Sequence, residues 1–506
     1  MREPWAHGYD RGALGDSTPA RKPVMSVEQT FKYARGGGMN IGILAMGWTP
    51  DVGGIQSHTA GLARVLLERG HQVFVLCLDT SGEHEPFTVH DHEVDGVQVR
   101  RVAYQYGDHG QLFHLMYHRG LNDVVLGWMA ETPCDLIHVH HVTGFGGGAL
   151  RAIDDVGQPL VMTLHDYWML DPRGQLFRPD GTNREPGCAE SLAEDLRGTW
   201  GHLLPSGGAR AVSPEGREFD DDSSLTEAYL KYSLELLEIP RRLIAPSRAA
   251  ARVFERAGVP EGRVQVVENG VDAGGLGEAT RALRASGSAE RPLTLGVIGT
   301  VLPSKGVLEL AQAFVAADVP SARLLIAGNA VPYHGDRSTI DAVTALAEEH
   351  ANVELRGEFA HADLASLLAE LDGVAAPSRW EEVYGLTVRE ARAAGLPVIV
   401  SDRGALPDVT DGGRAGLVVP VDDQQAWVDA IRRFVQDDES RAAWARHPAP
   451  VWTTEQMAVE LERLYADVVE EATGLRPDGP TEEAEEAPNP PATKPKGFFG
   501  RLFGRG

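Results

Sequence analysis

The chain has 506 residues, enough for roughly two to four domains, so a small scaffold stapled by disulfides is excluded. Hydrophobic residues make up 42% and charged residues 24% of the chain, the balance of a folded globular protein and not of a wholly disordered one. The formal net charge of −26 disfavours binding to nucleic acid unless a local basic patch overrides it.

The three cysteines, Cys77, Cys134 and Cys188, lie far apart in the sequence and form no CxxC pair. Their spacing argues against a disulfide framework and against a cysteine zinc site, and it fits a reducing compartment. The first residues lack the apolar core of a signal peptide, and no run approaches the ~20 apolar residues that cross a bilayer. We therefore expect a cytoplasmic protein.

Residues 1–38 carry no sustained apolar period and are expected to form a flexible leader. From residue 39 apolar strands alternate with amphipathic helices, the pattern of βαβ units and of a parallel sheet covered on both faces. A long polar insertion at 178–224 includes the aspartates at 220–222, which we expect to be solvated surface charge. This first domain is predicted to span residues 39–272, with strands at 41–46, 73–78, 97–103, 136–140, 160–164, 243–245 and 264–267.

Residues 273–292 are small, polar and rich in glycine, which is the composition of a linker. A second alternating series follows, and we expect a second domain at 273–448, a C-terminal helix at 449–471 and a disordered acidic tail at 472–506. The predicted strands of the second domain lie at 293–298, 324–327, 353–355, 374–376, 398–400 and 416–419.

Two tandem series of alternating strands and helices predict the α/β class, with two Rossmann-like doubly wound domains that face each other across a cleft. Open sheets of this kind bind ligands beyond the carboxyl ends of their strands. We therefore expect the active site between the two domains.

The most informative segment follows the predicted strand at 374–376. A short loop carries Glu382, and Gly385 precedes a predicted helix at 386–394. Free N–H groups and the positive end of the helix dipole make such a helix start an anion site that would fit a diphosphate. Glu390 lies about one turn inside the helix, so the two carboxylates can bind hydroxyl groups on different parts of one ligand.

Glu382 and Glu390, separated by seven residues, together with Gly385 and Leu386 resemble the EX7E motif of retaining glycosyltransferases of family 4, which have the two-domain GT-B architecture. The resemblance covers about residues 39–470. It implies that Glu390 binds the ribose of the donor nucleotide, that Glu382 contacts the transferred sugar and that Gly385 and Leu386 lie against the donor. It also implies retention at the anomeric carbon, a nucleotide-diphosphate sugar as donor substrate and no cofactor.

The segment from Gly299 to Gly306 ends the first strand of the second domain and resembles the phosphate loop of the same family. Lys305 would supply a point charge for phosphate, and Gly299 and Thr300 are expected to bind the donor. Thr300 stands where the family usually has arginine. Lys305 and the helix start at Gly385 are therefore expected to carry more of the charge of the leaving diphosphate.

Two segments of the first domain extend the resemblance. Gly53 and Gly54 lie in a glycine-rich loop whose backbone N–H groups could reach the donor phosphate or the acceptor across the cleft. His165 and Asp166 follow a predicted buried strand and resemble the family segment whose histidine faces the transferred sugar. A neutral imidazole there can exchange hydrogen bonds with a sugar hydroxyl and stabilise charge near the anomeric carbon. We place His165 in catalysis and Asp166 on the acceptor side.

Further histidines lie at the predicted strand ends of the first domain. His140 and His141 are predicted on the acceptor side. His138, His140 and His165 invite a metal-site interpretation, but no cysteine or glutamate completes a tetrahedral set at a recognisable spacing. An Asp-x-Asp motif for a diphosphate-bound metal is also not evident. We therefore expect a reaction that needs no metal.

The last residues, 494–506, are basic and aromatic after an acidic spacer. As a helix on lipid they would form a short interfacial anchor at the inner face of the membrane, with one apolar face made by Phe498, Phe499, Leu502 and Phe503. The alternatives are a disordered tail and a docking peptide for a partner protein.

These features predict a retaining, metal-independent glycosyltransferase that moves a sugar from a nucleotide-diphosphate sugar to a hydroxyl of a glycan or a lipid-linked acceptor. A nucleotide-sugar epimerase of the same architecture would instead release an isomerised sugar without consuming an acceptor. A non-catalytic glycan-binding scaffold is the third hypothesis, suggested by Thr300 and disfavoured by the presence of Glu382, Glu390, Lys305 and His165.

Overall fold

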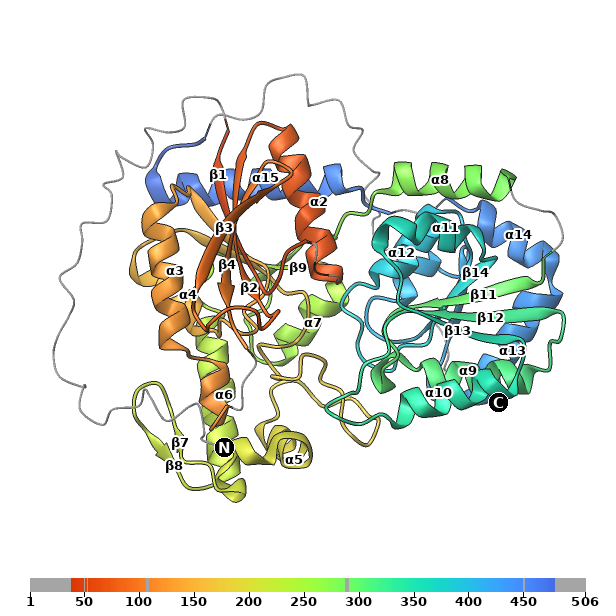
Figure 1. Ribbon diagram of the computed structural model, residues 1–506, viewed down its shortest axis with the longest axis horizontal. Coiled ribbons are helices and arrows are strands. Elements are labelled where there is room, and N and C mark those ends of the chain that lie inside the picture. Colours follow the sequence, from red (N-terminus) through yellow and green to blue (C-terminus); the bar gives the residue numbers. More distant parts are fainter. Residues whose placement is uncertain are drawn as a thin grey trace, which may run out of the picture.

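Two β-sheets with hydrophobic clusters on both faces form two domains that lie side by side (Figure 1). The computed structural model describes residues 38–49, 51, 53–105, 109–286, 291–448 and 451–477. Nearly all of the predicted leader and of the predicted tail, including its basic aromatic end, lies outside the described residues. The prediction of two Rossmann-like α/β domains is confirmed.

The sheet of the first domain has eight strands in the order β10-β9-β6-β5-β1-β2-β4-β3. All neighbours are parallel except β3, which runs antiparallel to β4. The seven parallel strands were predicted to within a residue or two because each contains buried apolar residues, whereas β3 was missed because its sequence VHDHEV is polar and largely exposed. The strands are β1 (Asn40–Ala45), β2 (Gln72–Asp79), β3 (Val89–Val94), β4 (Val97–Ala103), β5 (Leu136–Val139), β6 (Leu160–Thr163), β9 (Arg242–Ala245) and β10 (Val264–Val266).

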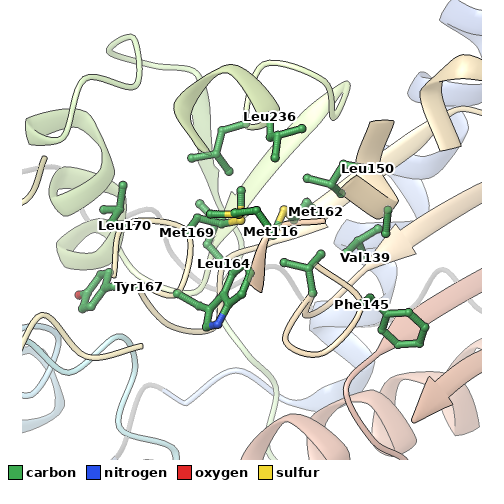
Figure 2. Close-up of a cluster of buried hydrophobic side chains, with 14 of the residues drawn as sticks. Met116, Val139, Phe145, Leu150, Met162, Leu164, Tyr167, Met169, Leu170 and Leu236 are labelled. Atoms are coloured by element: carbon green, nitrogen blue, oxygen red, sulfur yellow. The ribbon is translucent and has the colours of Figure 1, made fainter. Parts of the chain in front are cut away.

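Alternate side chains of these strands point to opposite faces and build two hydrophobic clusters. Figure 2 shows part of the larger cluster, where Met116, Met162, Met169 and Leu236 pack together. The helices of this domain are α2 (Gly54–Glu68), α3 (Arg119–Glu131), α4 (Gly148–Asp155), α5 (Ala189–Trp200), α6 (Asp222–Leu236) and α7 (Arg248–Arg256), with 3₁₀ turns at Leu112–Leu115, Gly201–Leu203 and Pro205–Gly207.

The polar insertion at 178–224 contains α5 and a small hairpin formed by β7 (Ala211–Val212) and β8 (Glu218–Phe219). Asp222 is buried there, and its carboxylate accepts hydrogen bonds from the Arg197 guanidinium at 2.6 Å and the Ser206 hydroxyl at 2.7 Å. The expectation that this aspartate is solvated surface charge was wrong. Donors that are distant in the sequence surround it and replace the hydrogen bonds of water.

The sheet of the second domain has six parallel strands in the order β13-β12-β11-β14-β15-β16. Counted from its own first strand, this is the Rossmann order, with the switch point between β11 and β14. The strands are β11 (Leu293–Ile298), β12 (Ala322–Ala327), β13 (Val353–Gly357), β14 (Gly373–Ala376), β15 (Val398–Ser401) and β16 (Gly416–Val419). The helices are α9 (Val307–Ala317), α10 (Ser338–Glu349), α11 (Leu364–Ala369), α12 (Leu386–Ala393), α13 (Gln424–Gln436) and α14 (Asp438–Arg446), with 3₁₀ turns at Pro303–Lys305, His361–Asp363 and Pro407–Thr410.

Most of the segment expected to be a linker, 273–292, is a helix, α8 (Ala273–Ser286), so that expectation was wrong. Leu276 packs against the hydrophobic cluster beneath α11 and α12, and Thr280 is fully buried. The glycines lower the intrinsic helix propensity of the segment, but tertiary packing of one face outweighs this cost. Gly277 also allows close contact, because a Cβ there would lie 2.8 Å from the carbonyl oxygen of Ala393.

The last helix, α15 (Thr454–Thr473), crosses back from the second domain and packs on α2 of the first domain (Figure 1). A capping box at Thr453 and Gln456 fixes its start. The buried Glu462 carboxylate accepts hydrogen bonds from the Arg69 guanidinium at 2.5 Å and lies 2.8 Å from His71 Nε2. Within the described residues, the structure contains no helix long and apolar enough to span a membrane.

Replacing Glu462 with glutamine is expected to lower the stability of the first domain by about 3 kcal/mol, because it leaves the Arg69 cation without its buried counter-ion. Urea unfolding followed by circular dichroism measures this loss. The matched control is Glu460→Gln on the same helix, where the carboxylate is 47% exposed and its ion pair with Arg463 contributes little. Equal stability of the two variants would contradict the assigned role of Glu462.

Candidate active site

Loops that follow the strands at the two switch points hold most of the predicted site residues. In the first sheet, Gly53 and Gly54 follow β1, and His140 follows the neighbouring strand β5. In the second sheet, Lys305 follows β11 and Glu382 follows the neighbouring strand β14. These are the carboxyl ends of the strands, the edge at which open α/β sheets bind ligands.

The Glu382 carboxylate forms the centre of the site in the second domain. Its side chain is 9% exposed, and Oε1 accepts hydrogen bonds from the Lys305 ammonium at 2.5 Å and from the Ser378 hydroxyl at 2.7 Å. Burial opposes ionisation, but the Lys305 charge and these hydrogen bonds outweigh burial and hold the pKa of Glu382 below its ordinary value. Glu382 is therefore an anion at neutral pH, with a cation beside it.

Backbone contacts between two loops hold Lys305 at this carboxylate. The 3₁₀ turn η4 (Pro303–Lys305) presents the Ser304 carbonyl, which accepts hydrogen bonds from the N–H groups of Arg379 at 2.8 Å and Trp380 at 3.3 Å. The Lys305 ammonium lies 5.0 Å from the centre of the Trp380 ring, within the range of a cation–π contact. The two loops therefore act as one unit that fixes the position of the lysine.

Two glycines with positive φ allow this close packing. Gly306 has a φ of 67°, and a Cβ there would lie 2.1 Å from the carbonyl oxygen of Pro377. Gly404 has a φ of 56°, and a Cβ there would lie 2.1 Å from the carbonyl oxygen of Glu382. A side chain at either position would push apart the loops that form the site.

Helix α12 starts at Leu386, directly after Gly385, which has a left-handed conformation with a φ of 75°. The first N–H groups of a helix have no partner within the helix, so this start remains available to an anion. Glu390 lies within the helix and is buried. Burial raises the pKa of Glu390 to about 8, so at neutral pH its carboxyl is largely protonated and can donate a hydrogen bond.

The raised pKa of Glu390 predicts a pH-dependent stability. Because the folded protein holds this proton more tightly than the unfolded chain does, wild-type stability falls as the pH rises from about 4.5 through 8. Glu390→Gln removes this dependence. The free energy of unfolding of the variant, relative to that of wild type, should therefore rise by about 3 to 4 kcal/mol between pH 5 and pH 8. Urea unfolding at both pH values measures the difference. The control is Glu349→Gln, at an exposed position, whose free energy of unfolding should match that of wild type at both pH values. A Glu390→Gln variant that also matches wild type at both would contradict the raised pKa of Glu390 and indicate a hydrated site.

The predicted histidines and aspartate of the first domain form two pairs. His141 Nδ1 accepts a hydrogen bond from the Thr143 N–H, so its Nε2 carries the proton and donates to Asp166 Oδ2 at 3.0 Å. His140 Nδ1 lies 3.0 Å from His165 Nε2. Burial, with a smaller contribution from neighbouring histidines, lowers the pKa of His140 and His165 well below 6.5, so both imidazoles are neutral at pH 7.

The loop that carries Glu382 packs into the first domain. The rings of Trp380 and Tyr167 lie 5.9 Å apart in an edge-on arrangement, and Trp380 belongs to the hydrophobic cluster of the first domain. The Ser247 hydroxyl, which caps α7, donates a hydrogen bond to the Val383 carbonyl at 2.6 Å. Tyr167 follows His165 and Asp166 directly, so this packing brings the two predicted halves of the site together.

Further contacts join the domains on either side of this loop. The Tyr384 hydroxyl donates to the Asn269 carbonyl at 2.6 Å, where the chain crosses between the domains. The Asn183 amide donates to the Arg379 carbonyl at 2.8 Å, and the Arg379 guanidinium donates to the Gly181 carbonyl at 3.1 Å. The contacts of Asn183 and Arg379 were not predicted from the sequence, because their partners are distant along the chain. Arg379 and Tyr384 flank the predicted Glu382, which is a signal for both residues.

The other predicted donor residues lie in neighbouring loops. The Gly299 N–H donates to the Ala327 carbonyl at 2.9 Å, and Thr300 is partly buried next to it. Gly53 has extended backbone and precedes the first residue of α2, Gly54. In the described part of the chain, no hydrogen bond joins these residues to Lys305 or Glu382.

Both domains match models of known families. Residues 52–274 match the model described as "Glycosyltransferase Family 4", and residues 279–447 match the one described as "Glycosyl transferases group 1". The chain is 25% identical over 395 residues to the phosphatidyl-myo-inositol mannosyltransferase of Mycolicibacterium smegmatis, covering 78% of this chain and 83% of that protein. It is 31% identical over 245 residues to the D-inositol 3-phosphate glycosyltransferase of Mycobacterium bovis, but this match covers only 46% of the chain and 50% of that protein.

Solved structures share the fold. Sucrose-phosphate synthase from Thermosynechococcus elongatus superposes with a TM-score of 0.59 at 19% identity, covering 85% of this chain and 99% of that one. Anabaena HepE in complex with UDP and glucose gives a TM-score of 0.56 at 20% identity, again covering 85% and 99%. At this level of identity the likeness concerns the two-domain architecture alone.

Proposed function

The chain belongs to the glycosyltransferases of the family 4 type, and we propose that it transfers a sugar from a nucleotide-diphosphate sugar to an acceptor hydroxyl with retention at the anomeric carbon. The observation that carries this proposal is the pair of Lys305 and Glu382 beyond the strand ends of the second domain, where the loop of Glu382 packs against the first domain. A cation next to a buried carboxylate suits a ligand that presents a diphosphate and sugar hydroxyls side by side.

We assign the nucleotide diphosphate to the second domain. The Lys305 ammonium and the N–H groups at the start of α12 stabilise the diphosphate, and Gly299 and Thr300 lie in the adjoining loop. Glu390 binds the ribose, and Glu382 binds hydroxyls of the transferred sugar. The complex of the similarly folded HepE with UDP and glucose supports a nucleoside diphosphate as the leaving group.

We assign the acceptor to the first domain, beside His165, Asp166, His140 and His141. Two relatives are named for mannosyl transfer to phosphatidyl-myo-inositol and for glycosyl transfer to inositol 3-phosphate. Their names support a polyol or a lipid-linked glycan as the acceptor of this chain. A lipid-linked acceptor would fit a cytoplasmic protein that contacts the membrane through residues 494–506, which cosedimentation of a truncated chain with liposomes tests.

The reaction breaks the bond between the anomeric carbon and the diphosphate oxygen, and the electron pair leaves with the nucleoside diphosphate. The acceptor oxygen bonds to the same face of the anomeric carbon, and its proton passes to the leaving phosphate oxygen. The Lys305 ammonium and the N–H groups at the start of α12 stabilise the charge that develops on the diphosphate. We propose that this charge stabilisation needs no metal ion on the diphosphate.

A screen of sugar nucleotides against polyol and lipid acceptors, with nucleoside diphosphate release as the signal, tests the proposal. We expect release that depends on acceptor and does not require added Mg²⁺ or Mn²⁺, and a product whose anomeric configuration matches the donor by NMR. An inverted product or a requirement for added Mg²⁺ or Mn²⁺ would contradict the mechanism. An isomerised sugar nucleotide formed without acceptor would identify an epimerase instead.

A further inference from the structure

Three histidines from separate elements meet in the first domain. His58 belongs to the second turn of α2, His140 follows β5 and His165 follows β6. The ring centres of His58 and His165 lie 4.7 Å apart, and the ring centre of His140 lies 5.3 Å from each of them. Each histidine offers one ring nitrogen within 4.8 Å of the other two. The cluster therefore brings three ring nitrogens from separate elements close to one another.

Several of these nitrogens lack a partner. Both ring nitrogens of His58 and Nε2 of His140 are buried without a hydrogen bond among the described residues. Leaving a buried polar group unsatisfied costs about 1–3 kcal/mol. Such a cost, repeated within one cluster, indicates that the site accommodates a further group.

The chemistry of the cluster selects the class of that group. All three side chains are imidazoles: both ring nitrogens of His58 have no hydrogen-bond partner among the described residues, and His140 Nδ1 and His165 Nε2 share one hydrogen bond. Neutral imidazole is a ligand for zinc, copper, nickel and cobalt, whereas magnesium and calcium require oxygen ligands. No carboxylate or thiol is part of the triad.

We propose that His58, His140 and His165 bind one divalent transition-metal ion of the zinc class. His140 Nδ1 and His165 Nε2 are hydrogen-bonded at 3.0 Å, which is also close to the separation of two ligands on a tetrahedral ion with Zn–N bonds of about 2.0 Å, so an ion would take the place of the shared proton. Three protein ligands leave the fourth position open. The sequence predicted no metal because no cysteine or glutamate completed a tetrahedral set, and His58 was not among the histidines considered. His138, which was considered, is hydrogen-bonded to Thr163 and Tyr465.

The ion would sit within the first domain, where the proposed function places the acceptor beside His140 and His165. Its binding does not depend on the proposed sugar transfer. Ligation through His165 Nε2 would place the proton of this ring on Nδ1, which fixes its tautomer as a hydrogen-bond donor.

A second triad, Asp79, His84 and His90, serves as an internal control. His84 Nδ1 and His90 Nε2 each lie 3.0 Å from the same oxygen, Asp79 Oδ2, so their hydrogen bonds already satisfy this oxygen. The His84 side chain is 44% exposed. We assign no ion to this triad.

The test is a titration of untagged, metal-free protein with Co²⁺, followed by the visible absorption of tetrahedral cobalt, and competition with Zn²⁺. We expect one equivalent to bind. His58→Ala should weaken binding at least a hundredfold, whereas His84→Ala should leave it unchanged. Circular dichroism shows whether the variants fold, and His58→Gln replaces the alanine variant if that one does not.

Absence of stoichiometric Co²⁺ or Zn²⁺ binding to the wild-type protein would overturn the proposal, and so would equal affinity in the His58 and His84 variants. Metal binding without sugar transfer would leave this proposal standing and contradict the proposed function alone. Sugar transfer by a protein that binds no metal would contradict the metal site and leave the proposed function standing.

Discussion

Glu382→Gln is expected to lower kcat for sugar transfer at least a hundredfold, while the protein stays folded. Glutamine has the same shape and keeps an oxygen for the Ser378 hydroxyl. It removes the negative charge beside Lys305 and the charge-assisted hydrogen bonds to the hydroxyls of the sugar. The Lys305 side chain is 29% exposed, so its ammonium remains hydrated and the loss of stability should be small. Nucleoside diphosphate release at saturating donor measures kcat.

The matched control for this variant is the neighbouring carboxylate. Glu381 Oε2 accepts a hydrogen bond from the Gly404 N–H at 3.0 Å, and glutamine at 381 keeps that acceptor. Glu381→Gln should therefore retain transfer to within a few-fold. Near wild-type transfer by Glu382→Gln, or an equal loss in both variants, would contradict the specific role of Glu382.

Lys305→Met is expected to lower kcat by about a hundredfold to a thousandfold and to raise KM for the donor. Methionine keeps the apolar contact with Trp380 but removes the only assigned side-chain cation for the diphosphate. The substitution also removes the charge that holds the pKa of Glu382 down, so burial should raise this pKa. The acidic limb of the pH–rate profile should then move to higher pH.

The exposed Lys231, 77% solvent-accessible at its side chain, provides the control substitution Lys231→Met. It should leave kcat, KM and the pH profile unchanged. A Lys305→Met variant with reduced kcat but an unmoved acidic limb would show that the lysine does not govern ionisation of Glu382.

The sequence allowed the parallel strands to be predicted because buried strands are short apolar runs bounded by turns. β3 was not predicted, because an exposed edge strand needs no apolar residues and the sequence VHDHEV resembles a loop. The helix α8 was not predicted either, because its composition is rich in glycine. Its stability comes from packing against α11 and α12.

In the site, too, features local in sequence were predicted and contacts between distant segments were not. Glu382 and Gly385 lie in one strand–loop–helix segment that is continuous in sequence, and Lys305 lies in another. The structure places Glu382 and Lys305 in contact. Contacts between distant segments could not be read in this way. Examples are Ser247 with Val383 and the return of α15 to the first domain, which depend on how the domains pack.

The most direct test of the account is a crystal structure of the protein with the nucleoside diphosphate identified by the donor screen. We predict that the diphosphate lies within hydrogen-bonding distance of Lys305 Nζ and of the N–H groups that open α12, with the ribose at Glu390. A diphosphate bound elsewhere, with the Lys305–Glu382 contact intact and no ligand beside it, would contradict the account.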